Sequence, residues 1–221
     1  MNSVTRRYDE FIRFPMRTMA QRASEFLQHM QTRRTVRQFS REPVGSEIVD
    51  DCLRTALLAP NGANRQPWTF VVVENSEVRK QIRDAAEAEE LEFYANRAPE
   101  EWLAALAPLG TDASKSFLET APILICIFAE SWKQMDDGTQ QKNYYVSESV
   151  GIATGFLIAA MHHAGLATLT HTPSPMKFLN SILNRPKNER AYLILVAGFP
   201  EPDCEVPVIT KRPFDEVVIR S

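Results

Sequence analysis

Cysteine is scarce in this chain of 221 residues, which has three cysteines. Cys52, Cys126 and Cys204 are odd in number, far apart and outside any metal-ligand spacing, a pattern typical of reduced thiols in a reducing compartment. His162 and His163 are adjacent, which is poor geometry for a shared metal ion, so no metal is expected. The sequence also has no glycine-rich phosphate loop, which disfavours a Rossmann or P-loop nucleotide site. Any phosphate must then be held by side chains.

A strong charge of one sign and long apolar runs are also missing. The net charge is −3, so no overall positive field draws the protein to nucleic acid or to an anionic membrane. The longest apolar run, residues 150–161, is shorter than the roughly 20 residues that span a bilayer. The N-terminus lacks the apolar core of a signal peptide. We therefore expect a cytoplasmic protein with neither nucleic-acid nor membrane partners.

What the chain does have is ample apolar sequence, at 44% of its residues. That fraction predicts one globular domain over residues 1–221 with a sizeable core. Residues 1–30 form an N-terminal helical extension in this prediction. Residues 200–221, with spaced prolines, form an extended C-terminal arm, and such an arm often packs on a partner subunit.

Hydrophobic periodicity predicts alternating helices and buried strands. The predicted helices are residues 47–59, 76–97 with Ser76 as the cap, 144–163 and 177–183; the predicted strands are residues 69–73, 122–128, 166–170 and 191–199. Nearly all-apolar strands separated by helices indicate a sheet with both faces covered. The predicted class is an α+β three-layer sandwich with a mixed central sheet between helices.

Three polar stretches carry possible binding chemistry. RRTVRQFS, residues 33–40, offers guanidinium and threonine donors that suit phosphate oxygens, although a solvated basic stretch has the same composition. The loop in APNGANRQPWTF, residues 59–70, can present backbone and amide groups to a ligand, or is only a turn before a strand. TLTHTP, residues 168–173, places hydroxyls and a histidine at a strand end, a common ligand position, or is strand filler.

A fourth stretch, EELEFYANRAPEEW at residues 89–102, sets aromatic side chains beside acidic ones where a helix ends. Glu90 and Tyr94 are four residues apart and therefore share one face of the helix. When these two residues are taken alone, a solvated helix face is the favoured explanation.

Taken in order, these stretches resemble the nitroreductase superfamily and, within it, the iodotyrosine deiodinase branch, from about residue 30 to residue 219. The resemblance implies a nitroreductase-like fold, bound FMN, and a homodimer with exchanged C-terminal arms in which each site is built from two subunits. In the family, the residue at Thr172 donates its hydroxyl to flavin N5, a contact that favours one-electron flavin chemistry, so Thr172 is the implied catalytic residue. The implied FMN-binding residues are Arg33, Arg34, Thr35, Val36, Arg37, Asn61, Gly62, Thr170, His171, Thr172 and Arg212. Asn61 stands where the deiodinases usually have serine, and His171 interrupts a run of three threonines.

The resemblance also interprets residues 89–102, called the lid below. Glu90, Tyr94 and Lys115 match the deiodinase residues that close over the substrate, which is a zwitterionic halotyrosine. Lys115 would meet its carboxylate, Glu90 its ammonium group, and the Ala63 backbone amide its phenolate. The implied activity is FMN-dependent reductive dehalogenation of 3-iodotyrosine to tyrosine and iodide, with NAD(P)H or a separate reductase as electron donor.

Rival functions remain open at this stage. Asn64, Gln66, Pro67 and Trp68 are closer to the general superfamily pattern, which keeps open a broad NAD(P)H-dependent nitro- or quinone-reductase. A flavin-binding protein without turnover is a second alternative. An RNA-binding module comes last because of the negative net charge.

Overall fold

This computed structural model describes residues 5–221, and the chain divides into two compact units, residues 1–33 and 34–221. The described part of the first unit contains helix α1 (Met16–Gln31), which starts after Pro15. Proline suits a helix start because its missing N–H has no partner there in any case. The predicted N-terminal extension therefore is helical in its second half, while residues 1–4 of that prediction lie outside the described residues.

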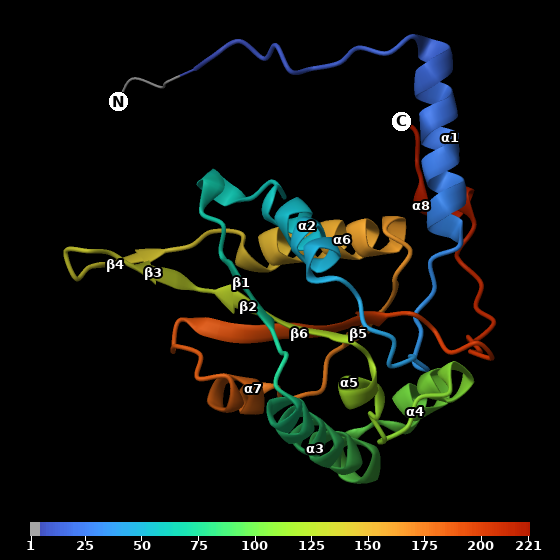
Figure 1. The fold of residues 1–221 in the computed structure, drawn as a ribbon, viewed down its shortest axis with the longest axis vertical. Coiled ribbons are helices and arrows are strands. Elements are labelled where there is room, and N and C mark those ends of the chain that lie inside the picture. The colour runs from blue at the N-terminus through green and yellow to red at the C-terminus, as the bar shows by residue number, and fades with distance from the viewer. Residues whose placement is uncertain (1–4) are drawn as a thin grey trace. The chain divides into compact units, whose positions relative to one another are not determined.

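The second unit is built on a central sheet of four strands in its described residues, which are 34–221. The spatial order is β1 (Trp68–Val72), β2 (Ile123–Glu130), β6 (Glu189–Gly198) and β5 (Ala167–His171), with every neighbouring pair antiparallel (Figure 1). A parallel bridge between Thr35 and Thr168 adds a mixed element at the outer edge of β5. Strands β1 and β5 therefore lie at opposite edges of the sheet.

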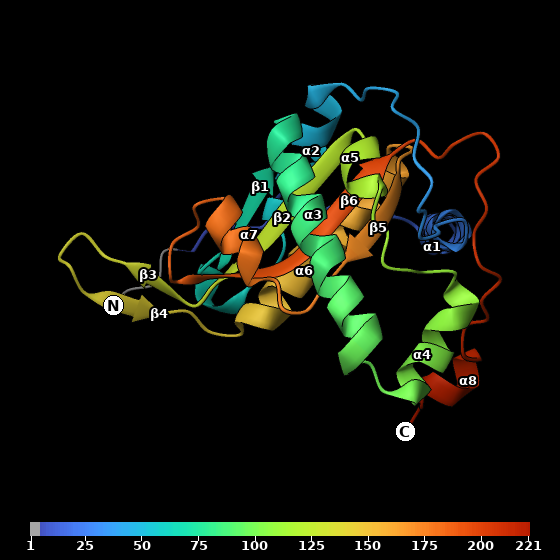
Figure 2. The same cartoon turned by 90° about the horizontal axis from the view of Figure 1, so that it is seen from below.

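Helices cover both faces of this sheet (Figures 1 and 2). One face carries α2 (Ser46–Leu57) and α6 (Val146–His163), and the other carries α3 (Ser76–Glu92), α5 (Phe117–Thr120) and α7 (Lys177–Ile182). Successive strand residues point to opposite faces, so Ile125 packs in one hydrophobic cluster and Cys126 in the other. Burial raises the pKa of the Cys126 thiol to about 12, as expected of a core side chain. The predicted three-layer α+β sandwich is confirmed.

Several predicted boundaries are corrected by local geometry. Asn75 caps α3 in place of Ser76, because its side chain accepts bonds from the Glu77 and Val78 amides at 2.9 and 3.1 Å. The predicted helix to Arg97 ends as an α-helix at Glu92 and continues as a π-helical turn, Phe93–Arg97. Helix α6 begins at Val146, not at residue 144, because Tyr145 has a left-handed φ of 49°.

Other short elements had no signal in the hydrophobic pattern. The exposed hairpin of β3 (Trp132–Gln134) and β4 (Gln140–Lys142) is polar, so it lacks the apolar alternation of a buried strand. Helix α4 (Glu100–Leu106) and the 3₁₀ turns Gly62–Asn64 and Ala107–Leu109 were also missed. The C-terminal arm is mostly irregular and contains α8 (Phe214–Val217).

Residues 5–221 lack two features that would indicate a membrane or a metal ion. No helix there is both long enough and apolar enough to cross a membrane. Within the same residues, His, Cys, Asp and Glu side chains form no group of three or more that could hold a metal ion.

Candidate active site

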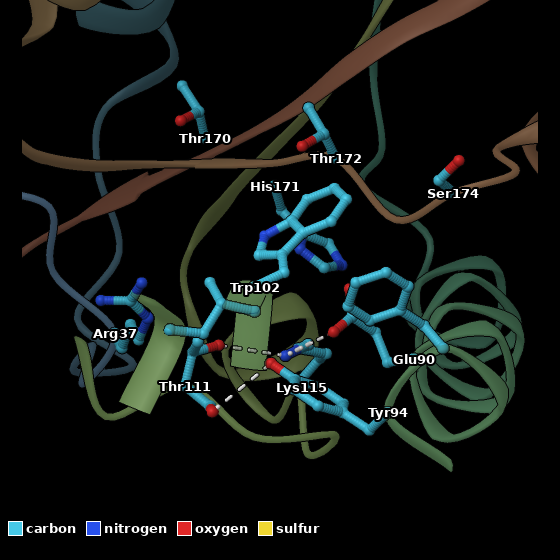
Figure 3. Close-up of a pocket in the computed structure, with 12 residues that line it drawn as sticks. Arg37, Glu90, Tyr94, Trp102, Thr111, Lys115, Thr170, His171, Thr172 and Ser174 are labelled. Carbon is cyan, nitrogen blue, oxygen red and sulfur yellow. Dashed lines mark hydrogen bonds and ion pairs between the residues drawn. The ribbon is translucent and has the colours of Figure 1, made fainter. Parts of the chain in front are cut away.

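The lid and the end of strand β5 enclose a cavity of about 220 Å³ (Figure 3). One wall comes from the end of α3, the π-helical turn and α4. The other comes from the strand end and from the loop that precedes α5. Its lining residues are Arg37, Glu90, Phe93, Tyr94, Trp102, Leu106, Thr111, Lys115, Thr170, His171, Thr172 and Ser174. The structure thus brings together the lid residues and the strand-end residues that the sequence singled out.

Lys115 and Glu90 form an ion pair inside this cavity. Lys115 Nζ lies 3.2 Å from Glu90 Oε2, and the two side chains are only 3% and 15% exposed. The ammonium group also donates to the Asp112 carbonyl and, at 3.4 Å, to the Thr111 hydroxyl. Because charges that are largely removed from water interact strongly, the pair holds the lid against the loop. The two groups present one positive and one negative charge side by side.

Aromatic side chains complete the lid. The ring of Phe93 stacks edge-on against Trp102 and Tyr94, with centroid separations of 5.1 and 5.6 Å. The Tyr94 hydroxyl donates to the Thr111 carbonyl at 3.4 Å. Arg97 reaches back to the Glu89 carboxylate at 2.9 Å and closes the π-helical turn. These contacts gather the aromatic rings of the lid beside the ion pair; that they exclude water around a ligand stays a prediction.

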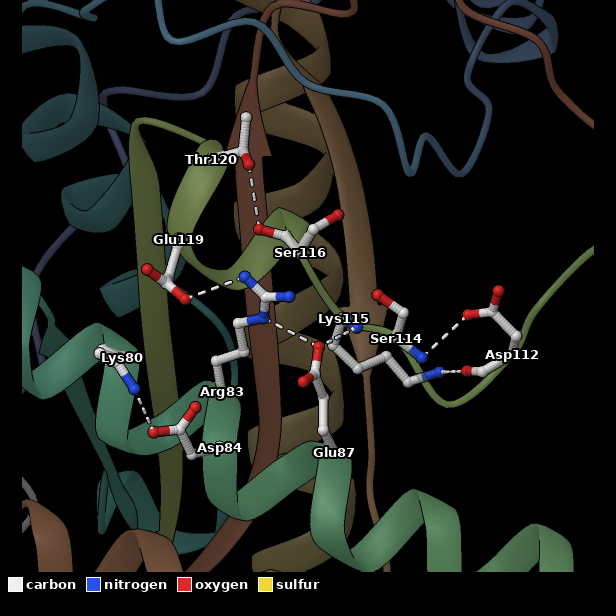
Figure 4. Close-up of polar contacts among 10 residues, drawn as sticks. All are labelled: Lys80, Arg83, Asp84, Glu87, Asp112, Ser114, Lys115, Ser116, Glu119 and Thr120. Carbon is white, nitrogen blue, oxygen red and sulfur yellow. Dashed lines mark hydrogen bonds and ion pairs between the residues drawn. The ribbon is translucent and has the colours of Figure 1, made fainter.

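A polar network that the sequence analysis missed positions Lys115 (Figure 4). Glu87 accepts the Lys115 backbone N–H at 2.6 Å and the Arg83 guanidinium at 2.8 Å. Arg83 also pairs with Glu119 at 3.0 Å. These residues tie α3 to the loop and to α5 on either side of Lys115. The spacing of Arg83, Glu87 and Glu90 by four and three residues on one helix was a signal that could have indicated a shared face.

The arginine-rich segment runs beside β5. The Val36 amide donates to the Thr168 carbonyl at 3.2 Å, and the Val36 side chain is buried. Arg37 lines the lid cavity and also a neighbouring cavity of about 400 Å³, which Thr35 and Pro207 line as well. Arg34 donates to the Pro207 carbonyl. The segment and the C-terminal arm therefore meet next to the lid cavity.

Two more arginines, Arg33 and Arg212, belong to the predicted set. Arg212 precedes α8, is largely exposed and pairs with Glu216 at 3.3 Å. It does not line the lid cavity in the described structure. Arg33 is the last residue of the first unit, so its contact with a phosphate stays a prediction from the sequence.

At the strand end, the side chain of His171 points to the opposite side from those of its threonine neighbours. Thr170 and Thr172 are exposed, whereas His171 is buried and sets its ring edge-on to Phe117 at 5.7 Å. Alternation along the strand places the histidine on the opposite side from the two hydroxyls. Burial, together with the positive charges of Lys115 and Arg37, lowers the pKa of His171 to about 3. The imidazole is therefore neutral at physiological pH.

Acid should weaken the fold through this histidine. Its pKa falls from 6.5 when unfolded to about 3 when folded, so between these values only the unfolded chain binds the proton. The stability contributed by the neutral ring is present above pH 6.5 and is lost as the pH falls, by at most about 1.4 kcal/mol per pH unit. Chemical denaturation of the parent and of His171→Phe at pH 7 and pH 4.5 measures this difference. Identical pH dependence of the two proteins would contradict it.

The loop with Asn61, Gly62 and Ala63 lies away from the lid cavity, before edge strand β1. Ala63, Asn64 and Gln66 have positive φ values of 51°, 53° and 50°, which are unusual for residues other than glycine. The Asn61 side chain holds this turn together by accepting from the Gln66 amide at 2.8 Å and donating to the Ala59 carbonyl at 3.1 Å. The asparagine at the position of the family's serine thus shapes its own loop. Positive φ values at residues other than glycine are strained, and such strain persists only where surrounding contacts hold the backbone in place.

The chain is similar to known proteins in sequence and in fold. The chain matches the Nitroreductase family over residues 30–199. It is 50% identical to the iodotyrosine deiodinase of Haliscomenobacter hydrossis over 199 residues, which cover 90% of each chain. It is 39% identical to iodotyrosine deiodinase 1 of Homo sapiens over 93% of this chain and 72% of the human protein. A crystal structure of oxidized iodotyrosine deiodinase bound to FMN and 3-iodo-L-tyrosine superposes with a TM-score of 0.73 at 32% identity, covering 88% of this chain and 97% of that one. The chain therefore belongs to the nitroreductase family and, within it, to the iodotyrosine deiodinase branch.

Proposed function

We propose that the protein is an FMN-dependent reductive dehalogenase that converts 3-iodotyrosine or a related halotyrosine to tyrosine and halide. The observation that carries this proposal is the buried Lys115–Glu90 ion pair. Tyr94 and Trp102 of the lid line the same cavity, as does Thr172 at the end of the strand. One carbon–halogen bond breaks and one carbon–hydrogen bond forms, which consumes two electrons and one proton. The relatives named above support the reaction class.

The residues present fit an FMN group. Thr35 and Arg37 line the cavity next to the lid, and Arg34 donates to the carbonyl of Pro207, which lines it as well. With Val36 between them, these residues would hold the phosphate, ribityl chain and ring edge, and Arg33 and Arg212 would be further cationic contacts. Guanidinium groups suit phosphate oxygens because they donate in pairs. Thr170 and Thr172 expose hydroxyls at the strand end, and Thr172 would donate to the flavin ring. Bound FMN would supply the electrons for dehalogenation.

The lid would recognise the zwitterion of the amino acid. Lys115 would pair with the substrate carboxylate, Glu90 with its ammonium group, and Tyr94 would add a hydrogen bond. Lys115 and Glu90 now pair with each other at 3.2 Å. The carboxylate and ammonium groups of a zwitterion would take the place of Glu90 and Lys115 as partners in this pair. Phe93 and Trp102 would keep water out, which strengthens each contact.

A homodimer would complete the site. The loop with Asn61, Gly62 and Ala63 precedes β1, whereas the lid cavity borders β5, and these strands are at opposite edges of the sheet. We propose that the partner subunit supplies the loop, so that the Ala63 amide reaches the phenolate and Asn61 and Gly62 border the flavin. The exposed C-terminal residues Val208, Phe214 and Ile219 suit an arm that packs on the partner.

The protein would act in the cytoplasm and take its electrons from a cellular reductant. NAD(P)H or a separate reductase would reduce the flavin. A cytoplasmic location is supported by the three cysteines, which are all free thiols.

Reduced holoprotein tests the reaction directly. We expect that dithionite-reduced, anaerobic protein is reoxidised by 3-iodotyrosine, with stoichiometric release of tyrosine and iodide measured by chromatography and an iodide electrode. A flavin that stays reduced with iodotyrosine but is reoxidised by a nitroaromatic would support the broad nitroreductase instead. A flavin that neither compound reoxidises would indicate a binding protein without turnover.

A further inference from the structure

His171 carries an unsatisfied nitrogen beneath the lid. The side chain is 8% exposed, and its Nε2 atom is buried and makes no hydrogen bond with any of residues 5–221. A buried polar atom without a partner is unfavourable, and native proteins rarely tolerate one without a reason. The reason here does not lie in packing alone, because an aromatic ring such as phenylalanine would fill the space without the unpaired nitrogen.

The position of this imidazole points to the ligand cavity. His171 and Lys115 both line it, and Figure 3 shows the ring extending from the strand end toward Lys115 and Glu90. Phe117 supports the ring edge-on from the core side at 5.7 Å. Phe93 and Trp102 of the lid line the same cavity. A ligand in this cavity would therefore lie beside the imidazole and against the lid.

The surrounding charges select the kind of group. Lys115 and Arg37 are near enough to lower the pKa of His171, so the ring is neutral and has one N–H donor. Two cations at this end of the cavity favour an anionic ligand atom. A neutral donor beside Lys115 suits one oxygen of a carboxylate, because the ammonium group and the imidazole then bind different lone pairs.

We propose that Nε2–H of His171 donates a hydrogen bond to the carboxylate of the amino-acid substrate beside Lys115, so that His171 is a substrate-binding residue and not a flavin ligand. This inference rests on the proposed halotyrosine substrate. The zwitterion would give Lys115 and Glu90 new partners and would satisfy the buried nitrogen in the same step. A ligand that has a carboxylate would then gain one more contact under the lid than a ligand that lacks it.

Ligand binding to variants of the oxidised holoprotein tests this assignment. We expect His171→Phe, which keeps an aromatic ring but has no donor, to raise the Kd for 3-iodotyrosine about tenfold. It should leave the Kd for 3-iodotyramine, which has the ammonium group but no carboxylate, unchanged. His171→Asn retains a donor and should stay within about threefold of the parent for both ligands. Titration of flavin fluorescence measures each Kd, and flavin absorbance checks that FMN is retained.

The outcomes separate this inference from the proposed function. Parent protein that does not bind 3-iodotyrosine would overturn both. Parent that binds it, together with a His171→Phe variant that binds it equally well, would overturn only the role of His171. Equal weakening of iodotyrosine and iodotyramine binding by His171→Phe would also overturn it, because the effect would then come from packing. Loss of affinity confined to the carboxylate ligand, with rescue by His171→Asn, would establish the contact.

Discussion

Lys115→Ala raises the KM for 3-iodotyrosine about 10- to 150-fold, the loss expected when one charge-assisted contact worth about 1.5 to 3 kcal/mol is removed. The reason is geometric. Lys115 is 3% exposed and pairs with Glu90 inside the cavity. The variant therefore loses the group that would pair with the substrate carboxylate. Glu90→Gln removes the partner of the ammonium group and should have a similar effect. Steady-state kinetics of reduced enzyme measures both.

Both variants should keep their FMN, because neither side chain lies in the arginine-rich segment. Flavin absorbance after purification checks this. Lys80→Ala is a matched control, since Lys80 is an exposed lysine of α3 that pairs only with Asp84 in the described structure. Its KM should equal that of the parent. Parent-like KM values for Lys115→Ala and Glu90→Gln would remove the lid from substrate recognition.

Two impaired variants should restore activity when their subunits are mixed and 3-iodotyrosine is kept below their raised KM. Lys115→Ala disables the lid, and Asn61→Leu removes the side chain that holds the turn presenting the Ala63 amide. If each site takes its lid from one subunit and its loop from the other, a heterodimer has one intact site. Random mixing makes half of the dimers mixed, so roughly a quarter of parental activity returns. Iodide release by the co-expressed, unfractionated mixture measures this quarter, and mixed dimers isolated through two affinity tags should have about half of the parental activity.

The matched control combines two lid variants. Lys115→Ala and Glu90→Gln damage the same half of the site, so every site in their heterodimer remains defective and activity should stay at the level of the separate proteins. Failure of Lys115→Ala and Asn61→Leu to complement each other, in dimers shown to be mixed, would mean that lid and loop serve the same site from one chain.

The sequence predicted structure best where residues close together in the chain decide it. The apolar runs around Ile125 and Ile194 predicted buried strands, and these strands form the centre of the sheet. The four-residue spacing of Glu90 and Tyr94 predicted a shared helix face, and both residues line the cavity. Boundaries were less predictable because Ser76 and Asn75 are both good caps, and only the backbone geometry selects between them.

Other features had no local signal. The hydrogen bond from the Lys115 backbone N–H to the Glu87 carboxylate joins residues 28 positions apart, and neither segment has a sequence pattern that predicts it. The polar hairpin of β3 and β4 lacks the apolar alternation by which strands are recognised. The resemblance grouped His171 with the neighbouring threonines as FMN-binding residues. In the structure, strand alternation turns its ring to the other side, under the lid.

By itself, the sequence determined the α+β class, the order of helices and strands, and the set of charged and aromatic residues from which a site could be built. These properties follow from periodicity and residue chemistry, which act over a few neighbouring positions. Only the tertiary structure decided that Glu90 and Lys115 pair out of water, that His171 is buried with an unpaired nitrogen, and that the Asn61 loop lies before the sheet edge opposite β5. The physical reason is that pairing, burial and strand order depend on which distant segments pack together, and packing is a property of the whole chain.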